Sequence, residues 1–163
     1  MTVELLTKVT FRYNEVEDRI LMSALLQSGE PVAFWLTQRL CGRIIPALTA
    51  HLERSVPRSS LIVDKGLLLS CQQREAEWQH KHSEPVRTTV MSPLVLPEKV
   101  SLLCSAQSAT MLFPLTDGAE AQLPMSFQEL RQLLAILYRQ FQYAGWPQEI
   151  WPKWLIKTES GRN

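Results

Sequence analysis

One stretch, residues 126–146 with the sequence SFQELRQLLAILYRQFQYAGW, constrains the fold more than any other part of the chain. Ser126 is followed three residues later by Glu129, the capping-box arrangement in which each side chain satisfies a backbone N–H of the first helical turn. Apolar side chains then recur at steps of three and four residues, which predicts one wide apolar face. Gly145 permits the left-handed conformation that ends helices, and Pro147 prevents resumption. A long one-sided helix must pack against another layer, and we expect a sheet.

Length and composition indicate a globular protein. The 163 residues fit one domain or two half-domains that share a core. The hydrophobic fraction is 45% and the charged fraction 20%, which is not the composition of a disordered chain. A net charge of +1 gives no overall attraction to nucleic acid or anionic membranes. No apolar run approaches the roughly 20 residues of a membrane span, and the start MTVELLTK lacks the features of a signal peptide. We therefore expect a cytoplasmic protein without a membrane partner.

The first third of the chain predicts three strands and a helix. Alternation in KVTFRY, and two apolar segments separated by the turn SGEP, are typical of strands. These expected strands are residues 8–13, 19–27 and 32–36. Thr37 then suits the N-cap of a helix over residues 38–54, whose apolar positions again recur at steps of three and four. Pro46 lies inside this pattern and predicts a kink at residues 42–45.

The last third repeats this order. Apolar segments bounded by turn residues predict strands at residues 100–106, 110–115 and 122–125. Pro114 cannot donate a ladder hydrogen bond, so we expect it at an edge or a bulge. The sequence TDGA at residues 116–119 predicts a hairpin turn.

The middle of the chain allows two interpretations. Residues 61–82 favour one long helix, although LIVDKGLLL could instead form a hairpin. In the helical interpretation the side chains facing inward are Leu61, Leu68, Cys71 and Trp78. Residues 83–96 contain two prolines and predict a loop with a short strand at 87–90. The three widely spaced cysteines, Cys41, Cys71 and Cys104, indicate buried reduced thiols.

The halves resemble each other in pattern, which predicts an α+β fold with an internal duplication. Each half has strands, a turn containing glycine, and a hydroxyl residue that opens a helix. We divide the chain into a first strand-and-helix half (residues 1–57), a linking segment (58–97) and a second half with an aromatic tail (98–163). All three share one core in this interpretation, with both helices on one face of an antiparallel sheet.

No catalytic or cofactor-binding pattern is present. The chain lacks the glycine-rich phosphate loops, the nucleophile elbow and the HExxH zinc motif. Glu75, Glu77, His80 and His82 come nearest to a metal site, but two histidines two residues apart do not share a helix face. Cys41 and Cys104 have no base close in sequence to form a thiolate. We predict no catalytic residue, no metal and no cofactor.

Basic residues with aromatic neighbours raise an alternative, a binder of single-stranded nucleic acid. Arg12 lies on the polar side of the first expected strand, and Arg39 and Arg43 lie four residues apart on the first helix. The repeated order of strands followed by a helix is similar to the topology of the Whirly and Pur-alpha families. That resemblance implies nucleic-acid binding on a sheet face. The families use four strands in each unit, whereas this sequence predicts three.

Trp146, Trp151 and Trp154 follow the last helix on a segment with prolines. These rings either fold back onto the core, which we favour, or contact a partner. Our leading hypothesis is a non-enzymatic interaction or adaptor protein that contacts another protein or a second copy of itself. The alternatives are the nucleic-acid binder and an enzyme of unrecognised type.

Overall fold

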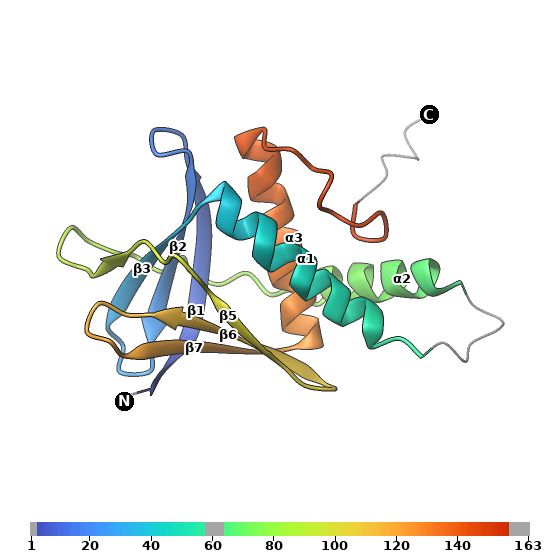
Figure 1. Ribbon diagram of the computed structural model, residues 1–163, viewed down its shortest axis with the longest axis horizontal. Coiled ribbons are helices and arrows are strands. Elements are labelled where there is room, and N and C mark those ends of the chain that lie inside the picture. The colour runs from blue at the N-terminus through green and yellow to red at the C-terminus, as the bar shows by residue number, and fades with distance from the viewer. Residues whose placement is uncertain (1–2, 58–63, 157–163) are drawn as a thin grey trace.

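The computed structural model describes residues 3–57 and 64–156, which form one mixed sheet and three helices (Figure 1). In chain order the elements are β1 (Val3–Asn14), β2 (Arg19–Leu26), β3 (Pro31–Leu36), α1 (Gln38–Arg54), α2 (Lys65–Trp78), β4 (Leu94–Val95), β5 (Ser101–Cys104), β6 (Ser108–Pro114), β7 (Glu120–Ser126) and α3 (Phe127–Ala144). The prediction of an α+β fold is confirmed.

The strands form a single sheet in the order β4-β3-β2-β1-β7-β6-β5. Within each half the strands are antiparallel, but β1 pairs with β7 and β3 pairs with β4 in parallel. The prediction of a purely antiparallel sheet is therefore wrong. It fails because the two meanders join through β1 and β7, which run in the same direction. Each half does contain three strands followed by a helix, and the duplication itself stays a prediction.

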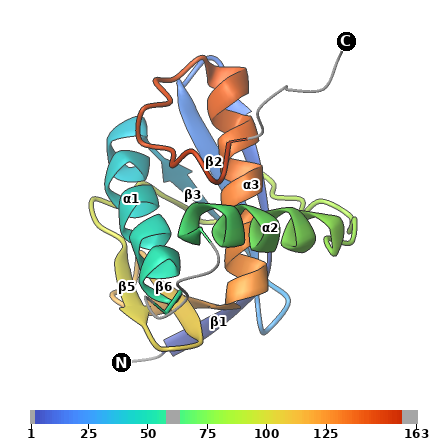
Figure 2. The ribbon, with the colours of Figure 1, turned by 90° about the vertical axis from the view of Figure 1, so that its right-hand side faces the viewer.

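A short connection forces this sheet to curl. Strands β4 and β5 lie at its opposite edges, yet only residues 96–100 separate them along the chain. Seven flat strands would place the edges about 29 Å apart. An extended connection of this length spans only about 21 Å. The sheet therefore bends until its edges approach each other, and α1 and α3 lie in its concave side (Figures 1 and 2).

The caps of α1 and α3 match the predictions. The Thr37 side chain accepts a hydrogen bond of 3.1 Å from the Leu40 N–H, and α1 continues through Pro46. The reciprocal capping box of Ser126 and Glu129 is present at α3. Gly145 ends α3 with a φ of 68°. These hydrogen bonds satisfy N–H groups that the first helical turns leave unpaired.

Helix α2 is shorter than predicted and turns a different face inward. It begins after Asp64, which caps it, and ends at Trp78. No hairpin forms at residues 64–69, and Leu61 lies outside the described residues. The buried positions are Leu69, Gln73 and Ala76, whereas Cys71 is exposed and Trp78 is 88% exposed. The inward assignment of Cys71 and Trp78 is therefore wrong, and that of Leu68, which is half-buried, holds in part. The packing partner of α2 is α3, which crosses it in Figure 2 and selects this face.

Other local predictions need correction. Residues 87–90 form no strand, and the short strand of this region is β4. Cys104 is exposed, so of the three cysteines only Cys41 is buried. Strand β1 begins five residues earlier than expected, because its start pairs with β7.

The core joins both halves of the chain. The rings of Phe34 on β3 and Phe113 on β6 lie 4.8 Å apart between centroids. The aromatic tail folds back onto this core, as favoured from the sequence. Trp146 and Trp151 each make an edge contact with Phe141 on α3, at 5.0 and 5.3 Å.

Candidate functional site

The three predicted arginines do not form one surface. Arg12 is exposed on β1, where it alternates with Phe11 and Tyr13, which pack against the core. It therefore lies on the outer side of the sheet. Arg39 and Arg43 are exposed on α1, on the concave side. A nucleic-acid strand that contacts Arg12 would have to cross the sheet to reach the α1 arginines.

The hollow beside Arg12 has a volume of about 760 Å³ but no net charge. Its ionisable lining includes Arg12 and Glu15, together with the phenols of Tyr13 and Tyr143. A cation balanced by a carboxylate gives little attraction for phosphate groups.

Trp151 and Trp154 are buried within the chain. They are 4% and 9% exposed, and the Trp154 indole N–H donates a hydrogen bond of 3.0 Å to the Glu53 carboxylate on α1. Burial of both rings favours the fold-back interpretation over a role in contacting a partner.

The outer side of the sheet differs between the two halves. Over the first half, the segment between α2 and β4 is bonded to β1 and, through the Ala33 N–H and the Pro93 carbonyl at 2.9 Å, to β3. Its Val86 N–H donates a hydrogen bond of 2.9 Å to the Thr10 hydroxyl. Beneath this segment Ser23 and Ala33, which lie on the outer side, are only 7% and 3% exposed. This part of the outer side is therefore covered, whereas the end of β1 that carries Arg12 is open.

Over the second half, none of the described helices covers the outer side, which carries an almost uncharged surface that we call the outer patch. The registers place on it the side chains that alternate with the buried core residues of β7 and β6 and their neighbours on β1 and β5. The outer patch consists of Val3, Leu5, Ser101, Leu103, Thr110, Leu112, Gln122 and Pro124. The exposed fractions of Val3, Leu5 and Leu103 are 52%, 38% and 58%. Ionisable residues lie at its margin: Glu120 is beside Val3, and Glu98 and Lys99 line a hollow together with Ser101 and Leu112 of the patch. None of the described helices covers the patch in Figure 1.

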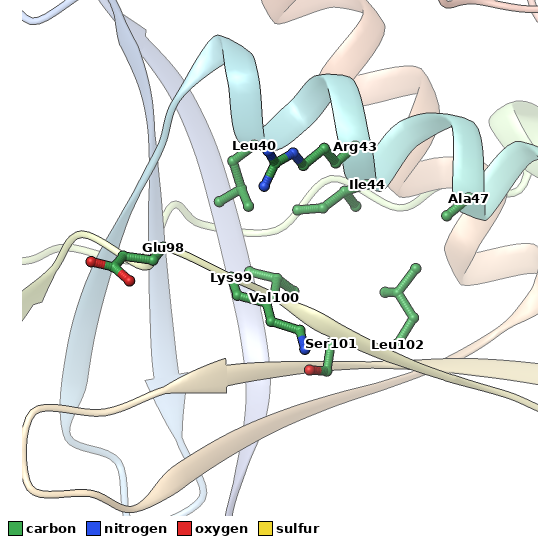
Figure 3. A pocket seen from close by; sticks show the side chains of 9 residues that line it. All are labelled: Leu40, Arg43, Ile44, Ala47, Glu98, Lys99, Val100, Ser101 and Leu102. Carbon is green, nitrogen blue, oxygen red and sulfur yellow. The ribbon is translucent and has the colours of Figure 1, made fainter.

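A groove separates α1 from the segment that leads into β5, and we call it the edge groove (Figure 3). It has a volume of about 440 Å³. Its wall on α1 is mainly apolar, and its lining is Leu40, Arg43, Ile44, Ala47, Glu98, Lys99, Val100, Ser101 and Leu102. In Figure 3 the apolar α1 side chains point toward the 98–102 segment.

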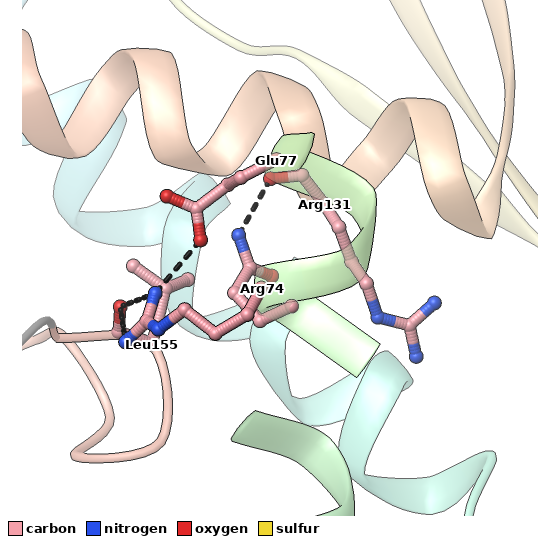
Figure 4. Close-up of polar contacts among 5 residues, drawn as sticks. Arg74, Glu77, Arg131 and Leu155 are labelled. Atoms are coloured by element: carbon pink, nitrogen blue, oxygen red, sulfur yellow. Dashed lines mark hydrogen bonds and ion pairs between the residues drawn. The ribbon is translucent and has the colours of Figure 1, made fainter. Parts of the chain in front are cut away.

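Polar contacts join α2 to the tail and to α3 (Figure 4). Arg74 forms an ion pair of 2.7 Å with Glu77 and also donates to the Leu155 carbonyl. The Gln73 side chain donates a hydrogen bond of 2.9 Å to the Arg131 carbonyl. These bonds hold α2, the tail and α3 together, although the buried Gln73 Oε1 accepts no hydrogen bond from the described residues, and they indicate a structural role.

Arg131 itself is a buried cation. It is 6% exposed, donates a hydrogen bond of 2.9 Å to the Gln72 side chain, and makes no ion pair within the described part of the chain. Burial lowers the pKa of its guanidinium, because desolvation disfavours the charged form.

The described residues offer little for catalysis. Burial raises the pKa of the Cys41 thiol to about 12, which keeps the nucleophilic thiolate from forming at neutral pH. Among residues 3–57 and 64–156, no group of three or more His, Cys, Asp and Glu side chains is arranged to hold a metal ion. The rings of His80 and His82 lie 6.1 Å apart, but Glu77 is engaged by Arg74.

Sequence reasoning missed both the outer patch and the edge groove. One signal was available in the sequence. The strands β5 (SLLC) and β6 (SATMLFP) contain no Asp, Glu, Lys or Arg, so neither of their two faces carries such a charge. Which of these side chains face outward depends on strand register, which local patterns do not give.

Comparisons with known proteins gave no relative. No family model, no curated protein and no solved structure matches the chain. No helix among the described residues is both long and apolar enough to cross a membrane.

Proposed function

We propose that this chain is a non-catalytic interaction protein that acts through the outer patch, and that the surface it binds is a second copy of the same patch. The observation that carries the proposal is the near absence of charge on a sheet face that no described helix covers. The buried centres of protein interfaces are depleted in charged residues, and exposed apolar patches on soluble proteins mark contact sites.

A second copy is the occupant that the charge distribution favours. Two-fold contacts bring the same surface together, so a charged patch would repel its own copy. The outer patch carries no charge within it, and the charges at its margin have both signs: Glu120, Glu98 and Lys99 line one hollow there. Phosphate groups, by contrast, would meet Lys99 at the margin in a hollow that Glu98 and Glu120 also line, which gives little net attraction. We include the internal duplication in this proposal. Two halves of similar fold would then differ in function because a chain segment covers the outer side of one half and not that of the other.

Sedimentation velocity over about 1 to 100 µM protein tests the proposal. We expect a reversible monomer–dimer equilibrium that Leu5→Lys weakens by about tenfold or more, because the substitution places two like charges across the contact. Val16→Lys is the matched control, since Val16 is 95% exposed on the β1–β2 turn, away from the outer patch.

Far-UV circular dichroism of both variants checks that the fold is retained. A chain that stays monomeric over the whole range would overturn the proposal, as would equal weakening by the two substitutions.

A further inference from the structure

We infer that the edge groove is a second binding site, which takes an extended peptide bearing acidic side chains as an additional strand on β5. This inference goes beyond the proposed function, because it concerns the groove on the other side of β5, with Ser101 as the residue common to both surfaces, and a different kind of ligand.

Strand β5 offers a main-chain edge that no described strand pairs with. It is the last strand of the sheet, with β6 as its neighbour on one side. The Ser105 N–H donates a hydrogen bond of 3.0 Å to the Ser108 carbonyl, which closes the β5–β6 hairpin. Since bonding alternates along an antiparallel pair, Leu103 and Ser101 bond toward β6, whereas the backbones of Leu102 and Cys104 face away. Such an edge is a template for an incoming strand.

Helix α1 supplies the opposite wall. Leu40 and Ile44 are each 5% exposed and form an apolar floor, and Ala47 lies one turn further along. Leu102 reaches this groove from the strand side. A peptide between α1 and β5 would therefore form main-chain hydrogen bonds with β5 only. Every second side chain of the peptide would face the apolar residues of α1.

The charge of the lining selects an acidic peptide. Arg43 and Lys99 contribute two cations and Glu98 one anion. Neither cation makes an ion pair within the part of the chain that the structure describes. A second copy of β5 is disfavoured here, because pairing two copies would bring these cations together.

The probe is a fluorescein-labelled six-residue peptide of alternating valine and glutamate, measured by fluorescence anisotropy at low salt. We expect saturable binding that Arg43→Glu and Lys99→Glu each weaken by about tenfold. Arg39→Glu is the matched control: Arg39 is exposed one turn away on α1 but does not line the groove, and we expect less than a twofold change. The corresponding valine–lysine peptide should not bind.

Strand addition is tested with two N-methylated versions of the peptide. In one version the odd amides are methylated, and in the other the even amides. Only one edge of an added strand bonds to β5, so one version should lose binding and the other should keep it. Thermal unfolding confirms that each protein variant is folded.

Several outcomes would overturn the inference. They are equal loss in Arg39→Glu and Arg43→Glu, equal binding of the lysine peptide, equal effects of the two methylation patterns, or no binding at hundreds of micromolar protein. Repeating the titration with Leu5→Lys separates the two sites, because this variant should bind the peptide normally whether or not the chain dimerises.

Discussion

At the scale of single residues, the Asp18 carboxylate connects parts of the chain that are far apart in sequence. It accepts hydrogen bonds from the Tyr13 hydroxyl at 2.6 Å and from the Trp146 indole N–H at 2.9 Å. Its backbone has a φ of 51°, a conformation that Asp and Asn tolerate better than most residues. Both bonds, that of Tyr13 first, lower the pKa of Asp18 below its ordinary value of 3.8. The bond to Asp18 likewise raises the pKa of Tyr13 above 10.0.

This coupling predicts a specific pH dependence of stability. The folded pKa of Asp18 lies below the unfolded one, so its contribution is fully present above pH 3.8 and is lost as the pH falls through the folded pKa. Asp18→Asn keeps the shape and the left-handed backbone but removes the charge. We expect it to lower the urea midpoint at pH 7, and the difference from the unmodified protein should vanish in strong acid.

Glu15→Gln is the control for this measurement, because it removes a negative charge from the same turn without removing either hydrogen bond. A loss of stability in Asp18→Asn that stays constant from pH 7 into strong acid would contradict the assignment.

At the scale of elements, two exposed glycines occupy opposite kinds of position. Gly145 ends α3 at a φ of 68°, whereas Gly42 lies inside α1, and neither would bring an added Cβ within 4 Å of another group. Gly145→Ala should lower the free energy of unfolding by about 1 kcal/mol, because a side chain strains the left-handed backbone. Gly42→Ala should raise it by about 0.8 kcal/mol, since alanine favours a helix interior. Urea unfolding measures both, and equal signs for the two substitutions would refute the explanation.

The same elements show what the sequence could predict. The bounds of α1 and the caps of α3 depend on Thr37, Ser126 and Gly145, which act within one helical turn, so local patterns sufficed. The inward face of α2 depends instead on its hydrogen bonds with α3. The Arg131 carbonyl accepts one from Gln73, and the Gln132 side chain donates one to the Ala76 carbonyl. The start of β1 and the outer patch depend on pairing with β7, more than a hundred residues away. No local pattern carries such information.

At the scale of the whole molecule, the two halves should unfold together. Val3 pairs with Glu120 at the centre of the sheet, and Phe34 of the first half packs on Phe113 of the second. Loss of either half would expose the core of the other. We therefore expect a single transition in urea, with tryptophan fluorescence and far-UV circular dichroism giving the same midpoint.

Three of the five tryptophans, Trp146, Trp151 and Trp154, weight the fluorescence signal toward the second half and the tail, whereas circular dichroism reports on all elements. Two separated midpoints would show that the halves are independent domains.

The connection between β4 and β5 has an evolutionary consequence. Glu98, Lys99 and Val100 belong both to this connection and to the lining of the edge groove. An insertion of one or two residues there would lengthen the connection that bends the sheet. The two sheet edges would then move apart, and the space beside α1 would widen. Surface loops tolerate such insertions at small cost in free energy. Changes in the length of this connection would therefore alter which peptides fit the proposed groove site, without any change in the buried side chains.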